Sequence, residues 1–353
     1  MLKDLTEAPG VPGQEGPVRE VMSRYLAPLG EITTDNLGSI VGIKSGAGVN
    51  RDNAPRVLVA GHMDEVGFLV THIDSDGFLK FQTLGGWWEQ VMLAQRVLVR
   101  TRKGEITGVT GSKPPHILSP EERKKLVDKN KIFIDIGATS KEHALELGVR
   151  PGDPVVPVCP FTVMANEKML LAKAWDNRIG CAVAVQTMKS IGGNHPNTLY
   201  AGATVQEEVG LRGATTLSQM VKPDVAISVD VCIAGDTPEI KKHEAQAKMG
   251  AGPAILIYDG SLIPNLKLRD LFADVAEEGG IPYQFESAAG GTDGGRFQLA
   301  GDGVPTISIG VPSRYIHSAT SMINRDDFEN ATRLLVAVIN RLDAETVSGL
   351  KAL

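Results

Sequence analysis

The sequence predicts an α/β protein in which a mostly parallel sheet carries helices on both faces and is interrupted by an inserted β-rich segment. Apolar strands alternate with amphipathic helices towards both ends of the chain, which is the pattern of a layered α/β sheet. Between residues 67 and 162 this alternation gives way to short β-type segments separated by Gly and Pro, as in a small barrel or sandwich. A length of 353 residues also exceeds one typical core. We therefore predict one unit from residues 1–66 and 163–353, and an inserted unit at 67–162.

The elements of the larger unit follow from hydrophobic periodicity and from the residues that end helices. Apolar residues from Val18 to Leu29 recur at helical spacing and predict a helix over 16–29. Gly192 and Gly193 end a helix that begins at residue 177. The remaining predicted elements are strands at 39–44, 56–62, 198–206, 224–231 and 304–311, and helices at 212–221, 265–278 and 326–343.

The insertion reads as β-strands with a single helix. Its apolar segments are 68–73, 77–82, 95–101 and 131–137. The one helix expected there is 139–148, with Thr139 and Glu142 spaced as a capping box. This pattern of short β-strands does not by itself show whether the insertion forms a protein interface or binds a substrate.

Composition excludes several classes of function. A net charge of −6 gives no electrostatic footprint for nucleic acid or for an anionic membrane. No apolar run approaches the roughly 20 residues that span a bilayer, and the first residues lack the pattern of a signal peptide. We expect a cytoplasmic protein. Three cysteines without CxxC spacing, Cys159, Cys181 and Cys232, indicate neither a disulfide framework nor a thiolate zinc site.

The stretch VLVAGHMDEVGF, residues 57–68, is an apolar strand that ends in charged residues. Because side chains alternate along a strand, His62 and Asp64 share one face while Glu65 points to the other. That shared face is a candidate site. The alternative interpretation is a strand that has reached the surface, where both side chains are solvated.

Other candidate ligands also follow strands. Glu207 and Glu208 end one apolar strand, Asp230 ends another, and His317 lies in a loop after a third. Asp176 precedes a helix, where it could instead act as an N-cap. In an open α/β sheet such residues meet at the carboxyl ends of the strands.

Carboxylates and imidazoles crowded at one rim are unfavourable unless cations neutralise them. As ligands, His62, Asp176, Glu208, Asp230 and His317 carry three negative charges. Two divalent ions and one hydroxide would balance that charge, whereas one ion would leave the ligand set negative. Oxygen and imidazole ligands suit zinc, cobalt or manganese. The sequence therefore predicts two divalent metal ions per subunit.

The chain resembles a known family, the tetrahedral (TET) or glutamyl aminopeptidases, some members of which are labelled endoglucanases. The resemblance rests on segments that occur in the family's order from the first helix to the last. These are GHMDEVGF, LGGWWEQV, GSKPPHILSPEER, AWDNRIG, QEEVGLRGA, SVDV with AGDTP, GGTDGG and RYIHS. Gly294 stands where many relatives carry alanine, which affects no catalytic position.

The resemblance implies roles for individual residues. His62 and Asp230 would hold one metal, Glu208 and His317 the other, and Asp176 would bridge them. Glu207 would be the general base. Asp64 would be the carboxylate that orients the imidazole of His62.

The resemblance also implies a substrate class and an assembly. The expected reaction is metal-dependent release of N-terminal residues from peptides with a free N-terminus. The inserted unit would be a dimerisation domain, and dimers would assemble into a tetrahedral dodecamer. We also expect self-association because the β-rich insertion carries the apolar segment GGWWEQVML.

Several alternatives stay open. A deacylase or carboxypeptidase could use the same metal site, and a non-catalytic scaffold would be expected to lack some ligands. A glycoside hydrolase is disfavoured because adjacent acids such as Glu207 and Glu208 would point to opposite sides of an extended backbone. Trp87 and Trp88 could line a substrate path or anchor the inserted unit, and Cys232 could approach the metals or only pack. The preferred N-terminal residue is not fixed by the sequence.

Overall fold

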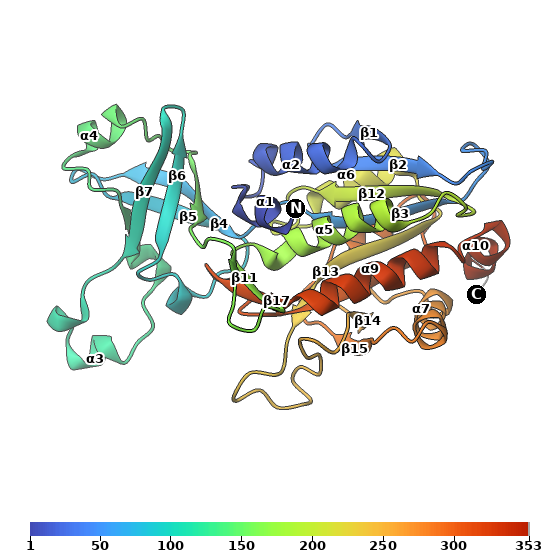
Figure 1. Ribbon diagram of the computed structural model, residues 1–353. Helices are drawn as coiled ribbons and strands as arrows, with labels where there is room; N and C mark the ends of the chain where they lie inside the picture. The colour runs from blue at the N-terminus through green and yellow to red at the C-terminus, as the bar shows by residue number, and fades with distance from the viewer. Residues whose placement is uncertain (352–353) are drawn as a thin grey trace.

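The computed structural model describes residues 1–351, which form a large layered part and a smaller barrel (Figure 1). The chain leaves the large sheet after β3 (Arg56–His62), builds the barrel, and rejoins the sheet at β10 (Thr162–Val163). Both marked chain ends lie in the large part (Figure 1). None of the helices in residues 1–351 is long and apolar enough to cross a membrane.

The large sheet has eleven strands and is mixed in direction. Its centre is parallel, in the order β12, β3, β13, β16, but the flanking pairs β1–β2, β2–β12 and β16–β17 are antiparallel. The expectation of a mostly parallel sheet therefore holds only for the centre. Short connections join β1 to β2 and β16 to β17, and a short connection can join only antiparallel neighbours. The other strands of this sheet are β1 (Glu31–Thr34), β2 (Ile40–Ser45), β11 (Met169–Ala172), β12 (Thr198–Thr204), β13 (Val225–Ile233), β14 (Ala254–Tyr258), β15 (Gln284–Ser287), β16 (Thr306–Arg314) and β17 (Ser321–Asn324).

Helices cover both faces of this sheet, as the alternation of side chains along β3 shows. Val57 and Val59 belong to one buried cluster, which also contains the apolar sides of α5 and α9. Leu58 and Ala60 belong to a second cluster with α6 and with Phe297 of α8. The helices of the large part are α1 (Leu2–Glu7), α2 (Gly16–Leu26), α5 (Trp175–Ser190), α6 (Arg212–Val221), α7 (Leu266–Glu278), α8 (Gly294–Phe297), α9 (Arg325–Ile339) and α10 (Ala344–Lys351).

The inserted strands close into a six-stranded barrel in the order β4, β5, β8, β7, β6, β9. Its interior is a hydrophobic cluster of its own, which includes Phe68, Val97 and Ile134. The strands are β4 (Gly67–Ile73), β5 (Leu79–Leu84), β6 (Arg96–Thr101), β7 (Gly104–Gly111), β8 (Phe133–Asp135) and β9 (Pro154–Pro157). Short helices connect them: α3 (Pro120–Arg123), α4 (Lys141–Glu146), and the 3-10 turns η1 (Glu89–Val91), η2 (Pro115–Ile117) and η3 (Lys129–Lys131).

The insertion differs from prediction at two helix starts. The capping box expected at the start of α4 is absent, because Ser140 is the N-cap and its Oγ accepts the backbone N–H of His143 at 3.1 Å. A capping box does occur at α3, which the sequence did not predict, between Ser119 and Glu122.

The two tryptophans of the insertion lie in different environments. Trp87 stacks on Phe68 with ring centroids 4.8 Å apart, and its Nε1 donates to the carbonyl of Gly67 at 3.1 Å. It is thus an anchor of the barrel core. Trp88 is 55% exposed and lines a pocket together with Tyr315 and His317 of the large part.

Candidate active site

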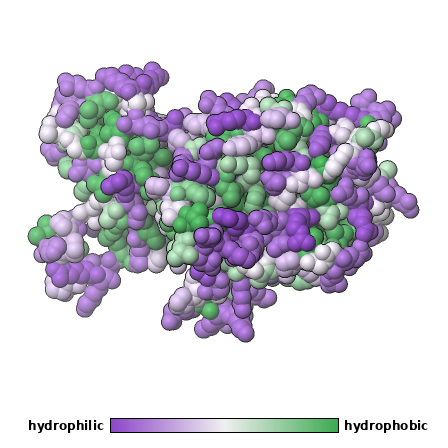
Figure 2. Space-filling view, in the orientation of Figure 1, coloured by the Kyte–Doolittle hydropathy of each residue, from purple (hydrophilic) through white to green (hydrophobic). Residues whose placement is uncertain are grey.

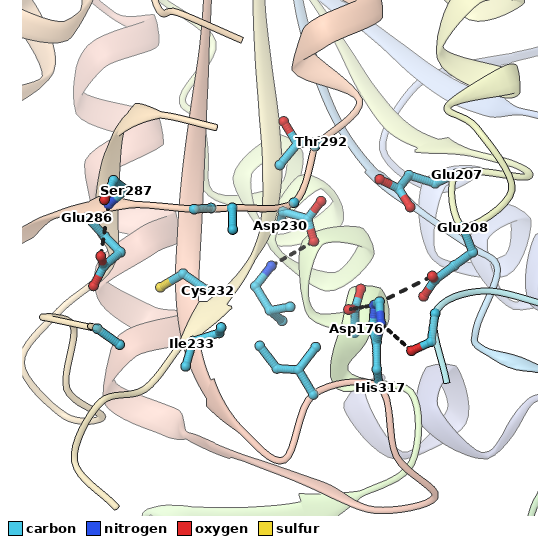
Figure 3. Close-up of a pocket in the computed structure, with 18 of the residues that line it drawn as sticks. Asp176, Glu207, Glu208, Asp230, Cys232, Ile233, Glu286, Ser287, Thr292 and His317 are labelled. Atoms are coloured by element: carbon cyan, nitrogen blue, oxygen red, sulfur yellow. Dashed lines mark hydrogen bonds and ion pairs between the residues drawn. The ribbon is translucent and has the colours of Figure 1, made fainter. Parts of the chain in front are cut away.

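The predicted ligands meet where the parallel strands end. His62 is the last residue of β3, and Thr204, its partner on β12, comes just before the loop with Glu207 and Glu208. Ser228 pairs with Ala60, so Asp230 and His62 each follow by two residues on the same face. The sequence-based expectation that these side chains share one rim is therefore met, since all of them line one cavity. Figure 3 shows Glu207, Glu208 and Asp230 at this cavity.

Close packing of α5 against β3 brings Asp176 to this rim. A Cβ added at Gly61 would lie 2.5 and 2.6 Å from backbone atoms of Gly180 and Cys181, so only glycine allows this approach. Asn177 starts the regular part of α5, because its Oδ1 accepts the N–H of Gly180 at 3.0 Å and its Nδ2 donates to the carbonyl of Val229 at 2.8 Å. Asp176 makes no capping bond, and its carboxylate is left for the site.

Asp176 lies between the two histidines. Its Oδ1 is 3.1 Å from Nε2 of His62, and its Oδ2 is 3.3 Å from Nε2 of His317. Glu208 Oε2 lies 3.5 Å from Nε2 of His317, while Glu207 Oε2 and Asp230 Oδ1 lie 3.7 and 4.0 Å from Nε2 of His62. By these distances Asp176 contacts both histidines, Glu207 and Asp230 lie on the His62 side, and Glu208 lies beside His317, where Figure 3 shows it with Asp176.

Each imidazole is held by its other nitrogen. Nδ1 of His62 is 3.0 Å from the backbone carbonyl of Asp64, and Nδ1 of His317 is 2.8 Å from the carbonyl of Gly86. Because a carbonyl only accepts, Nδ1 carries the proton in both rings and Nε2 is free to bind a cation. The Asp64 carboxylate, expected to orient His62, lies farther from the ring, at 3.5 Å.

Two buried carboxylates hold the loop that carries the adjacent acids. Asp64 accepts the backbone N–H groups of Glu207 and Glu208, each at 3.0 Å. Glu15 Oε1 accepts the N–H of Gln206 at 3.0 Å and that of Gly13 at 2.8 Å. Gln206 has a φ of 55°, in the left-handed region that non-glycine residues seldom adopt. Three consecutive N–H groups are thus fixed from outside the loop.

The donor atoms fit metal ions. Two groups have ligand atoms within 4.8 Å of one another, His62 with Asp176 and Glu208, and His62 with Glu207 and Asp230, so both contain His62 and neither contains His317. Nitrogen and oxygen ligands of a tetrahedral zinc ion lie roughly 3.4 Å apart, close to the separations found here. Oε1 of Glu208 is buried without a hydrogen-bond partner among the described residues, so a cation would satisfy it. Glu207 lies close enough to be a ligand or a base.

Crowding perturbs the titration of these groups. Burial and the charge of Asp176 raise the pKa of Glu208 to about 8. Burial also raises the pKa values of Glu207 and Asp230 well above their ordinary values. Burial opposes the charged form of His62, but the surrounding carboxylates, Glu207 first, raise its pKa well above the ordinary value. Cations bound at this rim would stabilise the ionised carboxylates.

The site opens into a cavity of about 910 Å³. The metal-type side chains form one end, and the rest is lined by the end of β13, by β14 and by the loop after β15. Cys232 lines the cavity but packs with Ala247, Ala254 and Leu256, and it belongs to neither metal-type group of the described chain. Such a concave space beside polar side chains suits a small ligand or a chain end.

Sequence reasoning missed the buried charges behind the rim. Glu65, which had no assigned role, accepts from Nζ of Lys173 at 2.6 Å and from Arg178 at 3.2 Å. Arg178 also donates to the carbonyls of Met63 and Ala8, at 2.6 and 2.8 Å. In the sequence, Arg178 stands out as a charged residue in an otherwise apolar helix. The sequence does not identify Glu65 as its partner.

Asp293, in the segment GGTDGG, is a second group that was not predicted. Its side chain is buried and accepts a hydrogen bond from Thr204 Oγ1, just before the loop that carries Glu207 and Glu208. Burial raises its pKa to about 7. Its Oδ1 has no partner among the described residues.

The M42 glutamyl aminopeptidase family matches residues 38–334, and a family described as AMPT matches residues 1–22. The chain belongs to the M42 glutamyl aminopeptidase family. As an M42 member it is a peptide hydrolase of the aminopeptidase type.

Curated M42 relatives cover nearly the whole chain. The putative aminopeptidase FrvX of Escherichia coli K12 is 42% identical, covering 99% of this chain and 96% of its own. The glutamyl aminopeptidase of Lactococcus lactis is 37% identical, with coverage of 99% and 98%. The lysyl aminopeptidase of Pyrococcus furiosus is 33% identical, with coverage of 97% and 96%.

Solved structures agree with this M42 assignment. A TET aminopeptidase from a marine sediment thaumarchaeon superposes with a TM-score of 0.95 at 49% identity, covering 99% and 98% of the two chains. The Pyrococcus horikoshii TET1 peptidase, described as assembling into a tetrahedron or a large octahedral shell, has a TM-score of 0.84 at 33% identity, with coverage of 95% and 97%. A Thermotoga maritima protein named endoglucanase has a TM-score of 0.79 at 29% identity and coverage of 99% of both chains.

Proposed function

We propose that this chain is an aminopeptidase that uses two divalent cations held by His62, Asp176, Glu208, Asp230 and His317. The observation that carries this proposal is the placement of Asp176, whose two oxygens face the free Nε2 atoms of two different histidines at 3.1 and 3.3 Å. A carboxylate in that position suits a bridge between two metal centres. His62 and Asp230 would hold one ion, and Glu208 and His317 the other.

The proposed catalytic roles of Glu207 and Asp64 follow from the groups that lie next to them. Two divalent cations would supply an activated water and polarise the substrate carbonyl. Glu207 Oε2 lies 3.7 Å from Nε2 of His62 and the pKa of Glu207 is raised, so it can accept a proton and later give it to the departing amine. Asp64 fixes the backbone at Glu207 and Glu208 and accepts from His62 through its carbonyl. The zinc, cobalt or manganese identity of the cations is part of this proposal.

The substrate is proposed to be a peptide with a free N-terminus. Relatives named glutamyl and lysyl aminopeptidases support release of a single N-terminal residue, but their names point to different side chains. A cytoplasmic location stays a prediction.

We infer an assembly as well. The catalytic unit would comprise residues 1–66 and 163–353, and residues 67–162, which contain the barrel, would form the dimerisation domain. Relatives described as a dodecamer and as a tetrahedron support assembly of the dimers into a tetrahedral dodecamer.

A deacylase or carboxypeptidase on the same ligands is the nearest alternative. A glycoside hydrolase has less support, although one similar structure carries the name endoglucanase. Two imidazoles directed at a shared carboxylate are metal-type geometry, whereas glycoside hydrolysis needs two carboxyl groups on either side of a sugar.

The experiment that tests the proposal combines metal content with product analysis. Protein freed of metal by a chelator and dialysed should release no amino acid from an unblocked peptide. Titration with zinc, cobalt or manganese should restore release, with activity reaching its plateau near two equivalents per chain. A plateau at one equivalent, or activity unaffected by chelation, would contradict the two-ion proposal.

A further inference from the structure

The cavity beside the ligand cluster has a second end with a different character. Figure 3 shows Cys232 and Ile233 between Asp230 and the pair formed by Glu286 and Ser287. Ile233 and Tyr258 also line this end and are 58% and 50% exposed, large values for apolar side chains in a folded protein. A peptide whose first carbonyl lies at the cations would have this end available for its N-terminal side chain.

The charges at this end are negative. Glu286 lies at this end, Glu244 lines the same cavity two residues before Gln246, whose backbone N–H donates to Glu286, and among the described residues that line the cavity none is Lys or Arg. Glu286 is already satisfied by backbone, since its Oε2 accepts the N–H groups of Gln246 and Ala247, each at 2.6 Å. Glu244 is exposed, accepts the N–H of Lys241 at 2.8 Å, and forms no ion pair within the described chain.

We propose that this end of the cavity receives the N-terminal side chain of the substrate and discriminates against acidic residues, with Glu244 as a specificity-determining residue. The inference rests on the proposed aminopeptidase function and names the substrate class of that site. Apolar side chains bury against Ile233 and Tyr258. Basic side chains lay their methylene stems on the same surface and direct the charged group towards Glu244.

An acidic N-terminal side chain is disfavoured at this end of the cavity. Aspartate or glutamate would leave water for a surface without a Lys or Arg partner and would lie near Glu244 and Glu286. A charge that loses its hydration without a partner is strongly disfavoured, and a like charge nearby adds to the cost. The expected penalty is on the order of 100-fold in kcat/KM.

The test is a substrate series on the full-length, metal-loaded protein. Peptides identical except for an N-terminal Leu, Lys, Asp or Glu are compared by kcat/KM, with released amino acids quantified by mass spectrometry. Leu and Lys peptides should be cleaved within about tenfold of each other, and the Asp and Glu peptides at least about 100-fold more slowly.

Variants of Glu244 test whether this residue causes the slow cleavage of peptides with an acidic N-terminal residue. Glu244→Lys should raise the ratio of Glu to Leu cleavage by about tenfold or more and lower the ratio of Lys to Leu, whereas Glu244→Gln should shift both ratios less. Glu239→Lys is the matched control, because it makes the same charge change at an exposed position of the same loop that does not line the cavity. For Glu239→Lys, the ratios of Glu to Leu and of Lys to Leu cleavage should match those of the unsubstituted chain.

The outcomes separate this inference from the proposed function. Cleavage of Glu peptides within tenfold of Leu peptides would overturn the selectivity and leave the aminopeptidase function standing. Equal ratios in Glu244→Lys and Glu239→Lys would overturn the assignment to Glu244. Release of no N-terminal residue from any peptide by the metal-loaded protein would overturn both.

Discussion

Asp64 holds Glu207 by its backbone, with Oδ1 of Asp64 3.0 Å from the backbone N–H of Glu207. The other oxygen of the same carboxylate accepts the N–H of Glu208 at 3.0 Å, and the carbonyl of Asp64 lies 3.0 Å from Nδ1 of His62. One buried residue therefore fixes the relative position of a proposed ligand on β3 and of two acids after β12. Adjacent side chains of the same chemistry can then take different roles.

Substitution of each of these acids by its amide should separate those roles. Glu207→Gln should keep both metals while turnover falls by roughly 10²–10⁴-fold, the effect of losing a general base. Glu208→Gln removes a charged ligand, so metal content and thermal stability should fall together with activity. Elemental analysis beside kcat for each variant is the measurement. If Glu207→Gln loses metal and Glu208→Gln retains two ions, the roles are reversed.

Glu15 should affect catalysis from outside the metal site, because it holds the strained backbone of Gln206 next to the two acids. Glu15→Ala should lower kcat by roughly 10–100-fold, since small misplacements of catalytic groups are costly. Glu15→Gln keeps an acceptor oxygen and should recover most of kcat.

Asp35→Ala is the control for Glu15. Its carboxylate accepts the N–H groups of Leu37, Gly38 and Ser39 in another loop, so the variant should lose stability without loss of kcat. A Glu15→Gln variant as inactive as Glu15→Ala would show that the hydrogen bonds to Gln206 and Gly13 are not what catalysis needs.

The ion cluster behind the rim should matter for stability. Glu65→Gln leaves the buried charges of Lys173 and Arg178 without their carboxylate, which should cost about 3–5 kcal/mol of unfolding free energy. The exposed pair Arg51–Glu31 provides the comparison, because Glu31→Gln should change stability by about 1 kcal/mol or less. Urea unfolding of both variants measures the difference, and equal effects would contradict the account of the buried cluster.

Self-association should depend on the barrel. Figure 2 shows hydrophobic residues on the visible face of the barrel as well as on that of the large part, and Trp88, Ile117 and Leu126 of residues 67–162 are 55–66% exposed. Sedimentation at micromolar concentration should show an oligomer, and Trp88→Glu should weaken it. A monomer would contradict the prediction, whereas a dimer alone would remove only the dodecamer.

The meeting of these side chains at one rim could be predicted from the sequence, because the carboxyl ends of neighbouring parallel strands lie at the same edge of a sheet. The bounds of β3 were predicted correctly, since its apolar run stops at His62. The direction of the outer strands was not predictable, because the sequence pattern of an apolar strand does not depend on whether its neighbour is parallel or antiparallel.

The supporting residues could not be predicted for a different reason. Glu15 and Gln206 are 191 positions apart, and Glu65 and Lys173 are 108 apart, so only the folded chain shows that they are partners. The start of α5 was ambiguous as well, because Asp176 and Asn177 are both common N-cap residues. The structure gives the capping bond to Asn177 and leaves Asp176 at the site.

The most direct test of the central claim uses one peptide in two forms, with a free N-terminus and with an acetylated one. Metal-loaded protein should release the first amino acid of the free peptide, leave the acetylated peptide intact, and lose this activity when a chelator removes the metals. Mass spectrometry of the products decides the matter. Removal of the acetyl group, release from the C-terminus, or cleavage that persists without metal would contradict the assignment of a metal-dependent aminopeptidase.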